Sequence, residues 1–219
     1  MQKYRIQLEL TSPCLPGAGE GWGSVIDTDL VFDSSGLPYF PARRLKGALR
    51  ESAVEVMEMM QNAKISYFDQ DLIKHVFGTP GDIEGGKIYF SNLHLPQYDE
   101  VSAWCRWALQ EYNNILSPDV ITNVLTEIRQ QTSINEDGLA ENHSLRTVRV
   151  LKTGLSFEGE ISLLSKNETA IDLLALSCAN LHRLGTMRNR GFGRVKCSLL
   201  AGNQNIFEKT INKLEKKVG

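Results

Sequence analysis

Apolar residues repeat along this chain with two different periods, and the order in which the period changes limits the folds open to it. Polar and apolar residues alternate over residues 4–11, which predicts a half-buried strand. From Pro41 to about residue 60 the apolar residues recur at helical spacing. After a Gly-Thr-Pro-Gly break at residues 78–81, residues 87–93 alternate again and predict a second strand. The first half therefore reads strand, helix, strand.

The second half of the chain continues in the same way. Residues 99–130 are predicted to be mostly helical, with a split at Pro118. The later elements are a β-hairpin of residues 145–152 and 155–164 around Thr153-Gly154, a helix from Asn167 to about Leu184, a strand over 193–200 and a helix over 205–218. This order predicts an α+β fold with a ferredoxin-like (RRM-like) β-α-β-β-α-β core. No linker divides the chain, so we expect one domain over residues 1–219, with a helical insertion at about 99–130.

Length, cysteine usage and hydropathy bound the class of protein. A chain of 219 residues can bury a sizeable core. Its four cysteines are widely separated, which argues against a zinc site and against a disulfide framework. The N-terminus lacks the apolar segment of a signal peptide, and no apolar run reaches membrane-spanning length. We therefore expect a cytoplasmic protein with no membrane partner.

Positive charge is concentrated in three stretches that contain no acid. The net charge of −2 does not by itself indicate nucleic-acid binding. Residues 41–50, 143–152 and 183–196, however, each contain Lys and Arg without Asp or Glu. Such segregation lets one face bind phosphates while acids elsewhere balance the charge. On the predicted helix after Pro41, Arg43, Lys46 and Arg50 lie three and four residues apart and so share one face.

Residues 17–50 place glycines, a carboxylate and this basic helix in succession. Glycine occupies every second position from Gly17 to Gly23, so a large ligand can approach the main chain closely. Asp27 follows directly. Residues 188–194 form a second cluster of glycine and arginine, and two such loops can face one another in a compact domain. Together these features favour a site for a nucleic-acid backbone over an ordinary loop.

Three segments resemble the RAMP superfamily, and most closely the repeated backbone subunit of type III CRISPR effector complexes. They are GSVIDTDLVFDSSGLPYFPARRLKGALR, TSINEDGLAENHSLRTVRVLKTGLSFEGEI and LGTMRNRGFGRV. The first is the most specific, because an acid before an apolar run, then Leu-Pro, then Leu-Lys-Gly-x-x-Arg is rarely met by chance. The last resembles a glycine-rich loop that RAMP proteins of several functions share.

The resemblance implies that copies of the protein line up along a guide RNA, together with other subunits of a type III complex, and cut target RNA. The excursion at about residues 130–145 matches the thumb-like hairpin that displaces nucleotides of the guide–target pairing. Asp27 matches the acid that cuts opposite each displaced position. The predicted RNA-binding residues are Arg43, Arg44, Lys46, Arg50, Arg146, Arg149, Arg188, Arg190, Gly191, Gly193 and Arg194.

Asp29 and Asp33 lie near Asp27, so position alone leaves open which carboxylate cuts. Cleavage would use the ribose 2′-hydroxyl, placed in line with the leaving oxygen. The carboxylate would act as a base or hold Mg²⁺ or another divalent cation. The sequence departs from the family at residues 41–44, where Pro-Ala-Arg-Arg replaces a serine-rich turn, and some family members have lost cleavage. The alternative is therefore a non-catalytic guide-binding scaffold or a capping subunit.

Two other activities are less favoured by the sequence. An endoribonuclease that processes guide precursors typically uses a histidine early in the chain, whereas the first histidine here is His75. His143, in the polar excursion, is the histidine that remains to be tested. Lys152-Thr153-Gly154 resembles one motif of serine β-lactamases, but the chain lacks the Ser-x-x-Lys partner.

Three aromatic residues have both a structural and an RNA-binding interpretation. Trp104 and Trp107 lie three residues apart on a predicted helix, a spacing that is typical of core residues, and we expect both to be structural. Phe192, between two glycines, fits equally a base-stacking and a core position.

Overall fold

A five-stranded antiparallel sheet forms the centre of the computed structural model, which describes residues 2–16, 30–79, 86–132, 139, 144–164 and 167–218. The strands lie in the order β2-β5-β1-β6-β7. Their bounds are β1 Gln2–Leu10, β2 Ile88–Phe90, β5 Ser156–Leu163, β6 Val195–Ala201 and β7 Gln204–Asn205. In β1, Tyr4, Ile6, Leu8 and Leu10 are buried and alternate with exposed or half-buried residues, as the two-residue period predicts.

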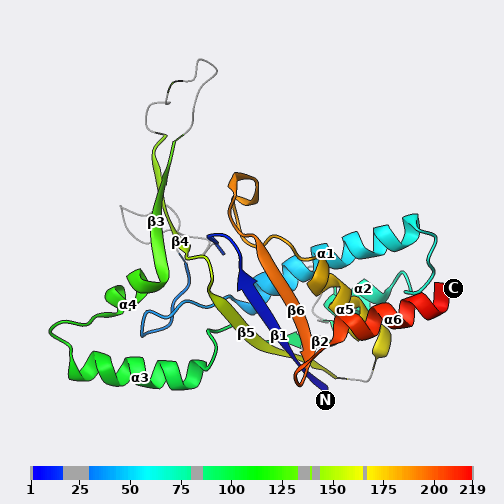
Figure 1. Cartoon of the computed structure of the whole chain (residues 1–219), viewed down its shortest axis with the longest axis horizontal. Coiled ribbons are helices and arrows are strands. Elements are labelled where there is room, and N and C mark those ends of the chain that lie inside the picture. The colour runs from blue at the N-terminus through cyan, green and yellow to red at the C-terminus, as the bar shows by residue number, and fades with distance from the viewer. Residues whose placement is uncertain are drawn as a thin grey trace.

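Two long helices connect the core strands and pack on each other. Helix α1 (Ala42–Asn62) joins β1 to β2, and helix α5 (Glu168–Asn180) joins β5 to β6 (Figure 1). Asn167 caps α5, because its Oδ1 accepts a hydrogen bond from the Ala170 amide at 3.1 Å. The order β1-α1-β2-β5-α5-β6 with the sheet order β2-β5-β1-β6 is the ferredoxin-like arrangement, so the predicted fold class is confirmed.

The predicted hairpin of residues 145–152 and 155–164 is wrong in its pairing, although both strands exist. Strand β4 (Arg146–Leu151) pairs with β3 (Thr126–Gln131), whereas β5 pairs with β1 and β2. Gly154, at a φ of 88°, turns the chain, and its amide donates to the Leu10 carbonyl at 2.8 Å. The turn at Gly154 is thus hydrogen-bonded to the end of β1. Because of this bond, the next strand, β5, pairs with β1 and not with β4.

Two helices and one strand lie within the segment predicted as a helical insertion at about 99–130. It contains α3 (Tyr98–Glu111) and α4 (Pro118–Leu125), which begins at the predicted proline. Residues 126–130 are predicted to continue the helix and instead lie in β3 (Thr126–Gln131). The β-branched Thr126 and Ile128 favour this extended backbone, and they pair with Leu151 and Arg149 of β4. The two-stranded β3–β4 sheet projects from the molecule (Figure 1), and most of the predicted excursion at 130–145 lies outside the described residues.

The two tryptophans of α3 are not in the core, which contradicts the sequence prediction. Trp104 is 62% exposed and Trp107 is 51% exposed, while Ser102, Cys105 and Ala108 form the buried side of the helix. Helical spacing places the tryptophans on one face correctly but does not tell which face is covered. Within the described residues, no helix is long and apolar enough to cross a membrane.

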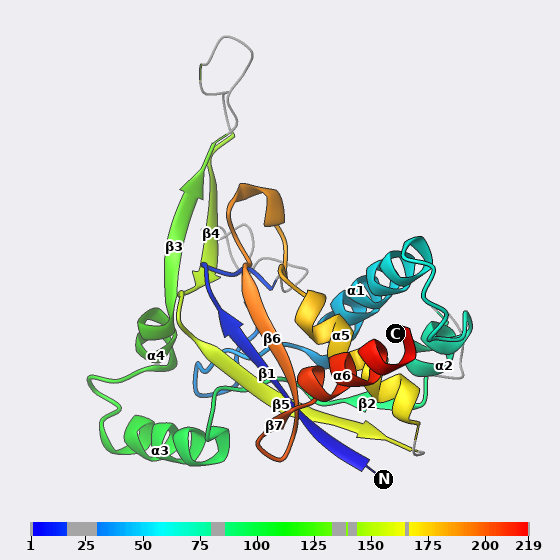
Figure 2. The same ribbon diagram turned by 45° about the vertical axis from the view of Figure 1, so that its right-hand side comes forward.

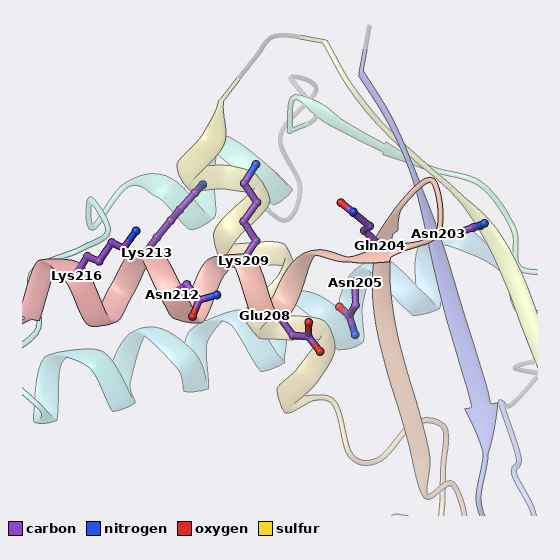
Figure 3. Close-up of a pocket in the computed structure, with 8 residues that line it drawn as sticks. All are labelled: Asn203, Gln204, Asn205, Glu208, Lys209, Asn212, Lys213 and Lys216. Atoms are coloured by element: carbon purple, nitrogen blue, oxygen red, sulfur yellow. The ribbon is translucent and has the colours of Figure 1, made fainter.

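Helix α6 (Ile206–Val218) is fixed by a buried carboxylate. Asp172 of α5 is 1% exposed, accepts hydrogen bonds from the Tyr67 and Thr210 hydroxyls at 2.8 Å each, and pairs with Lys213 at 3.0 Å. These partners offset the cost of burying its charge. Figure 3 shows Lys213 on the side of α6 that lines an open cavity of about 790 Å³, and this cavity contains none of the predicted site residues.

Candidate nucleic-acid interface

The segment that follows β1 lies against the loop that precedes β6. We call residues 183–194 the arginine–glycine loop. The Thr186 amide donates to the Leu15 carbonyl at 2.9 Å, and the Gly193 amide donates to the Pro13 carbonyl at 2.8 Å. The Cys14–Leu151 bridge, formed by two main-chain hydrogen bonds of 2.8 and 3.1 Å, also ties this segment to β4. The residues that lead into the predicted N-terminal glycine loop therefore touch both the second loop and the hairpin.

The glycines of the arginine–glycine loop have different roles. Gly193 has a φ of 72°, and a Cβ atom built on it would lie 2.0 Å from the Leu184 carbonyl oxygen. Gly185, at a φ of 92°, would place a Cβ atom 2.3 Å from the Leu15 carbonyl oxygen. Gly191, at a φ of 83°, faces open space. Of the two glycines predicted to bind RNA, Gly193 is thus required by packing, and Gly191 alone is open to a ligand.

Gly193→Ala is expected to destabilise the protein by about 3 kcal/mol or more, because it combines a left-handed backbone with a main-chain clash. Gly191→Ala is the matched control: it has the same kind of φ without the clash, and its cost is about 1 kcal/mol. Urea unfolding followed by circular dichroism measures both. Equal costs for the two variants would contradict the assignment of Gly193 to packing.

The start of α1 is held in place by contacts with the strand segment after β2. The Asn92 side chain accepts a hydrogen bond from the Ala42 amide at 2.9 Å, which satisfies one of the free amides at the helix start. Phe40 exchanges two main-chain hydrogen bonds of 2.9 Å with Leu93. Arg44 reaches back along the chain, and its Nη1 donates to the Pro16 carbonyl at 2.7 Å. The basic helix start is thus joined directly to the entrance of the N-terminal loop.

A cavity of about 210 Å³ separates α1 from the arginine–glycine loop. We call it the arginine cavity. Its lining residues are Pro16, Phe40, Arg44, Gly47, Ala48, Glu51, Arg183, Leu184, Gly185, Thr186 and Arg188. Gly47 has nothing within 4 Å of the position of a Cβ atom, so the helix offers bare backbone at this point. Arginines from two distant parts of the chain therefore surround one opening.

Only part of the predicted basic face borders the arginine cavity. The residues of α1 that line it are Arg44, Gly47, Ala48 and Glu51, which lie on one face of the helix. Arg43, Lys46 and Arg50 share a neighbouring face and do not line the cavity. The sequence prediction named this second face, and it omitted Arg183, Thr186 and Glu51 as site residues. Their only sequence signal was nearness to the glycines and the basic clusters.

The arginines of the loop are engaged with three different parts of the molecule. Arg183 Nη1 donates to the main-chain carbonyl of Arg188, which holds the short 3₁₀ turn of residues 188–190. The Arg188 side chain pairs with Glu51 of α1, with Nη1 and Oε2 3.4 Å apart. Arg190 Nη1 donates to Gln131 Oε1 of β3 at 3.1 Å. Figure 2 shows the loop beside the upper part of the β3–β4 hairpin, away from α4.

The hairpin contributes one predicted arginine to this surface and keeps another away from it. Arg146 is exposed and lies opposite Gln131 in the β3–β4 register, next to the Arg190 contact. Arg149 instead reaches α4, where its Nη1 donates to Asn123 Oδ1 at 3.1 Å. Arg194 is exposed, and its main chain bonds to Thr11 and Ser12. Arg44, Arg146, Arg188 and Arg190 are therefore the predicted residues that the structure gathers around the loop.

Of the three candidate carboxylates, Asp27 and Asp29 lie outside the described residues, and Asp33 is engaged in holding a turn. Asp33 Oδ1 accepts hydrogen bonds from the Ser35 and Leu37 amides at 2.8 and 2.9 Å. Its Oδ2 accepts from the Tyr98 hydroxyl at 2.7 Å. Burial, followed by this hydrogen bond to Asp33, raises the pKa of Tyr98. Asp33 thereby links the turn after the N-terminal loop to the start of α3.

Neither the histidines nor the acids of the described residues form a second reactive cluster. His94 stacks between Tyr39 and Tyr98, with ring centroids 5.5 and 4.1 Å away, and burial lowers its pKa. His143 lies outside the described residues. Phe192 is buried in the core, which decides between its two interpretations. Within the described ranges no group of three or more His, Cys, Asp or Glu residues could hold a metal ion.

A family model and several solved structures resemble this chain. The model of the RAMP superfamily matches residues 7–196. The chain belongs to the RAMP superfamily. Among curated proteins none matches this RAMP protein.

The solved structures that resemble this chain include two cryo-EM structures of type III-B Cmr-β. A chain of the complex bound to cognate target RNA superposes with a TM-score of 0.66 at 14% identity, over 91% of this chain and 97% of that chain. A chain of the apo state gives a TM-score of 0.63 at 14% identity, over 92% of this chain and 98% of that chain. At this identity the matches establish the shared fold.

Proposed function

We propose that this RAMP protein is a subunit of a type III CRISPR ribonucleoprotein and binds the backbone of a guide RNA at the arginine cavity. The observation that carries the proposal is the meeting of Arg44, Arg183 and Arg188 from two distant segments around one opening. Guanidinium groups bind phosphate oxygens through planar, paired hydrogen bonds. Open backbone at Gly47 and Gly191 lets a ligand approach where any larger side chain would obstruct it.

The fold and the family agree with this function. The similar Cmr-β chain belongs to a type III-B complex that was solved with cognate target RNA. The β3–β4 hairpin projects next to the arginine–glycine loop and carries Arg146 at its outer described end (Figure 1). A projecting hairpin of this kind can insert between a guide and its target and separate neighbouring base pairs. The partners are then guide RNA, target RNA, other copies of this chain and other subunits.

We further propose that Asp27 cuts the target RNA. In this mechanism a nucleotide displaced by the hairpin has its 2′-hydroxyl in line with the leaving oxygen, and Asp27 accepts the hydroxyl proton. The 2′-oxygen forms a bond to phosphorus as the bond from phosphorus to the 5′-oxygen breaks, which leaves a 2′,3′-cyclic phosphate and a 5′-hydroxyl that takes its proton from water. An arginine near the reacting phosphate would stabilise the charge that develops there. The described residues contain no group of three or more possible metal ligands, and Asp33 is engaged in its turn, so a divalent cation would be held by Asp27 and the substrate phosphates.

A scaffold without cleavage is the second candidate. It is favoured by one observation: among the described residues, Glu51 is the only acid that lines the arginine cavity, and it pairs with Arg188. Both candidates require the same RNA-binding surface and differ only in what Asp27 does.

Co-purification tests the shared part of both candidates. The protein is expressed together with a repeat-spacer RNA, purified, and its bound nucleic acid is extracted and sequenced. We expect RNA with a fixed end derived from the repeat. Protein that carries no RNA, or only RNA of random ends, would contradict guide binding.

A further inference from the structure

Glu51 lines the arginine cavity and is the only acid among its described lining residues, which include three arginines. Its side chain is 66% exposed, and that of its partner Arg188 is 49% exposed, so water and solutes reach both groups. The pair spans the arginine cavity, because Glu51 belongs to α1 and Arg188 to the arginine–glycine loop. Glu51 holds Arg188 less tightly than Asp172 holds Lys213, since the Glu51–Arg188 separation is 3.4 Å and the Asp172–Lys213 separation is 3.0 Å.

A carboxylate and a phosphate compete for the same guanidinium group. An exposed ion pair contributes between zero and about 1 kcal/mol, so a polyanion with several contacts can displace Glu51 from Arg188. The displaced carboxylate then remains next to the phosphate and repels it. Glu51 therefore lowers the affinity of the site in two ways, by occupying Arg188 and by opposing the incoming charge.

The charge on this face of α1 changes sign along the helix. Arg44 lies at the helix start, the open Gly47 follows, and Glu51 comes one turn later. One further turn along, Glu55 Oε2 accepts a hydrogen bond from Asn180 of α5 at 2.8 Å. A backbone of phosphates is thus favoured at the first turns of α1 and opposed beyond them.

We propose that Glu51 is a competing counter-ion that RNA phosphate displaces from Arg188, and that it marks the end of the phosphate path along α1. This inference rests on the proposed function of RNA binding at the arginine cavity. Glu51 is a residue that tunes affinity and position, and it is not a catalytic residue.

A double-mutant cycle tests this role. The four proteins are the wild type, Glu51→Gln, Arg188→Ala and the double variant, purified free of RNA and titrated with a fluorescent single-stranded RNA at several salt concentrations. We expect Glu51→Gln to tighten binding about 2- to 5-fold and to steepen the salt dependence by roughly one phosphate contact. In the Arg188→Ala background the same change should have much less effect, because the competition is for Arg188.

Glu58→Gln is the matched control, since it removes the same charge from an exposed position on α1 that does not line the arginine cavity. We expect it to leave binding within error of the wild type. Tightening of equal size in Glu58→Gln, or in the Arg188→Ala background, would show a general charge effect and overturn the specific role of Glu51. Weaker binding by Glu51→Gln would mean that the pair preorganises Arg188, and this too overturns the proposal. If the wild-type protein binds no RNA, the proposed function of RNA binding at the arginine cavity is itself contradicted.

Discussion

Replacing Asp27 by Ala is expected to reduce cutting of target RNA by at least about 100-fold while guide RNA remains bound. A positioned base contributes roughly 10²- to 10⁴-fold to proton transfer, and in the proposed function guide binding depends on the arginines and not on this acid. The assay uses the complex assembled on its guide and a labelled complementary target, with cleavage products resolved on a denaturing gel. Guide content is measured on the same preparation.

Two neighbouring acids provide controls for this experiment. Asp29→Ala should leave cutting within a few-fold of the wild type. Asp33→Asn should act mainly on the stability of the turn, because the Asp33 carboxylate accepts three hydrogen bonds within 2.9 Å. Wild-type cutting rates in Asp27→Ala would exclude Asp27 as the base and favour the scaffold. Loss of cutting only in Asp29→Ala would move the role to that residue.

Reversing Arg44 and Arg188 to Glu should weaken guide-RNA binding by about 100-fold at low salt, with the same loss for unrelated RNA sequences. Phosphate contacts act through the release of counter-ions, so the loss of two contacts lowers the slope of log K against log salt by about 1.4 to 1.8. Filter binding at several salt concentrations measures both quantities. Because Arg44 also bonds to the Pro16 carbonyl, thermal unfolding of the variant checks that the fold survives.

The companion variant reverses Arg43 and Lys46, which share the neighbouring face of α1. This change also adds negative charge near the phosphates, and we expect it to weaken binding less than the Arg44 and Arg188 reversal does. A larger effect from Arg43 and Lys46 would place the RNA on that neighbouring face. Unchanged binding in both variants would contradict an electrostatic interface at the start of α1.

Local patterns predicted the elements of this protein better than they predicted the partners of those elements. The alternation in residues 146–151 and 156–163 identified two real strands, yet nothing in it told that Gly154 bonds to Leu10 and sends the second strand along β1. Similarly, helical spacing grouped Trp104 with Trp107, but burial depends on what packs against α3, and that is not encoded within the helix itself.

The candidate site shows the same division. Clusters of arginine and glycine can be read directly from the sequence, and residues 44 and 188 do meet at one cavity. The sequence could not separate Gly193, which packs against Leu184, from Gly191, which faces solvent, because both have positive φ and only the surroundings differ. The sequence also could not show that Glu51, which lies just after the acid-free stretch 41–50, pairs with Arg188 of the arginine–glycine loop.

The Cys14–Leu151 bridge has a mechanical consequence. It bonds Leu151, at the base of the projecting hairpin, to Cys14, which lies three residues before the N-terminal glycine loop. The two segments are therefore held together at one point. Under the proposed function, a force on the hairpin from a bound RNA duplex would therefore be transmitted to Cys14 through the two main-chain hydrogen bonds between Cys14 and Leu151.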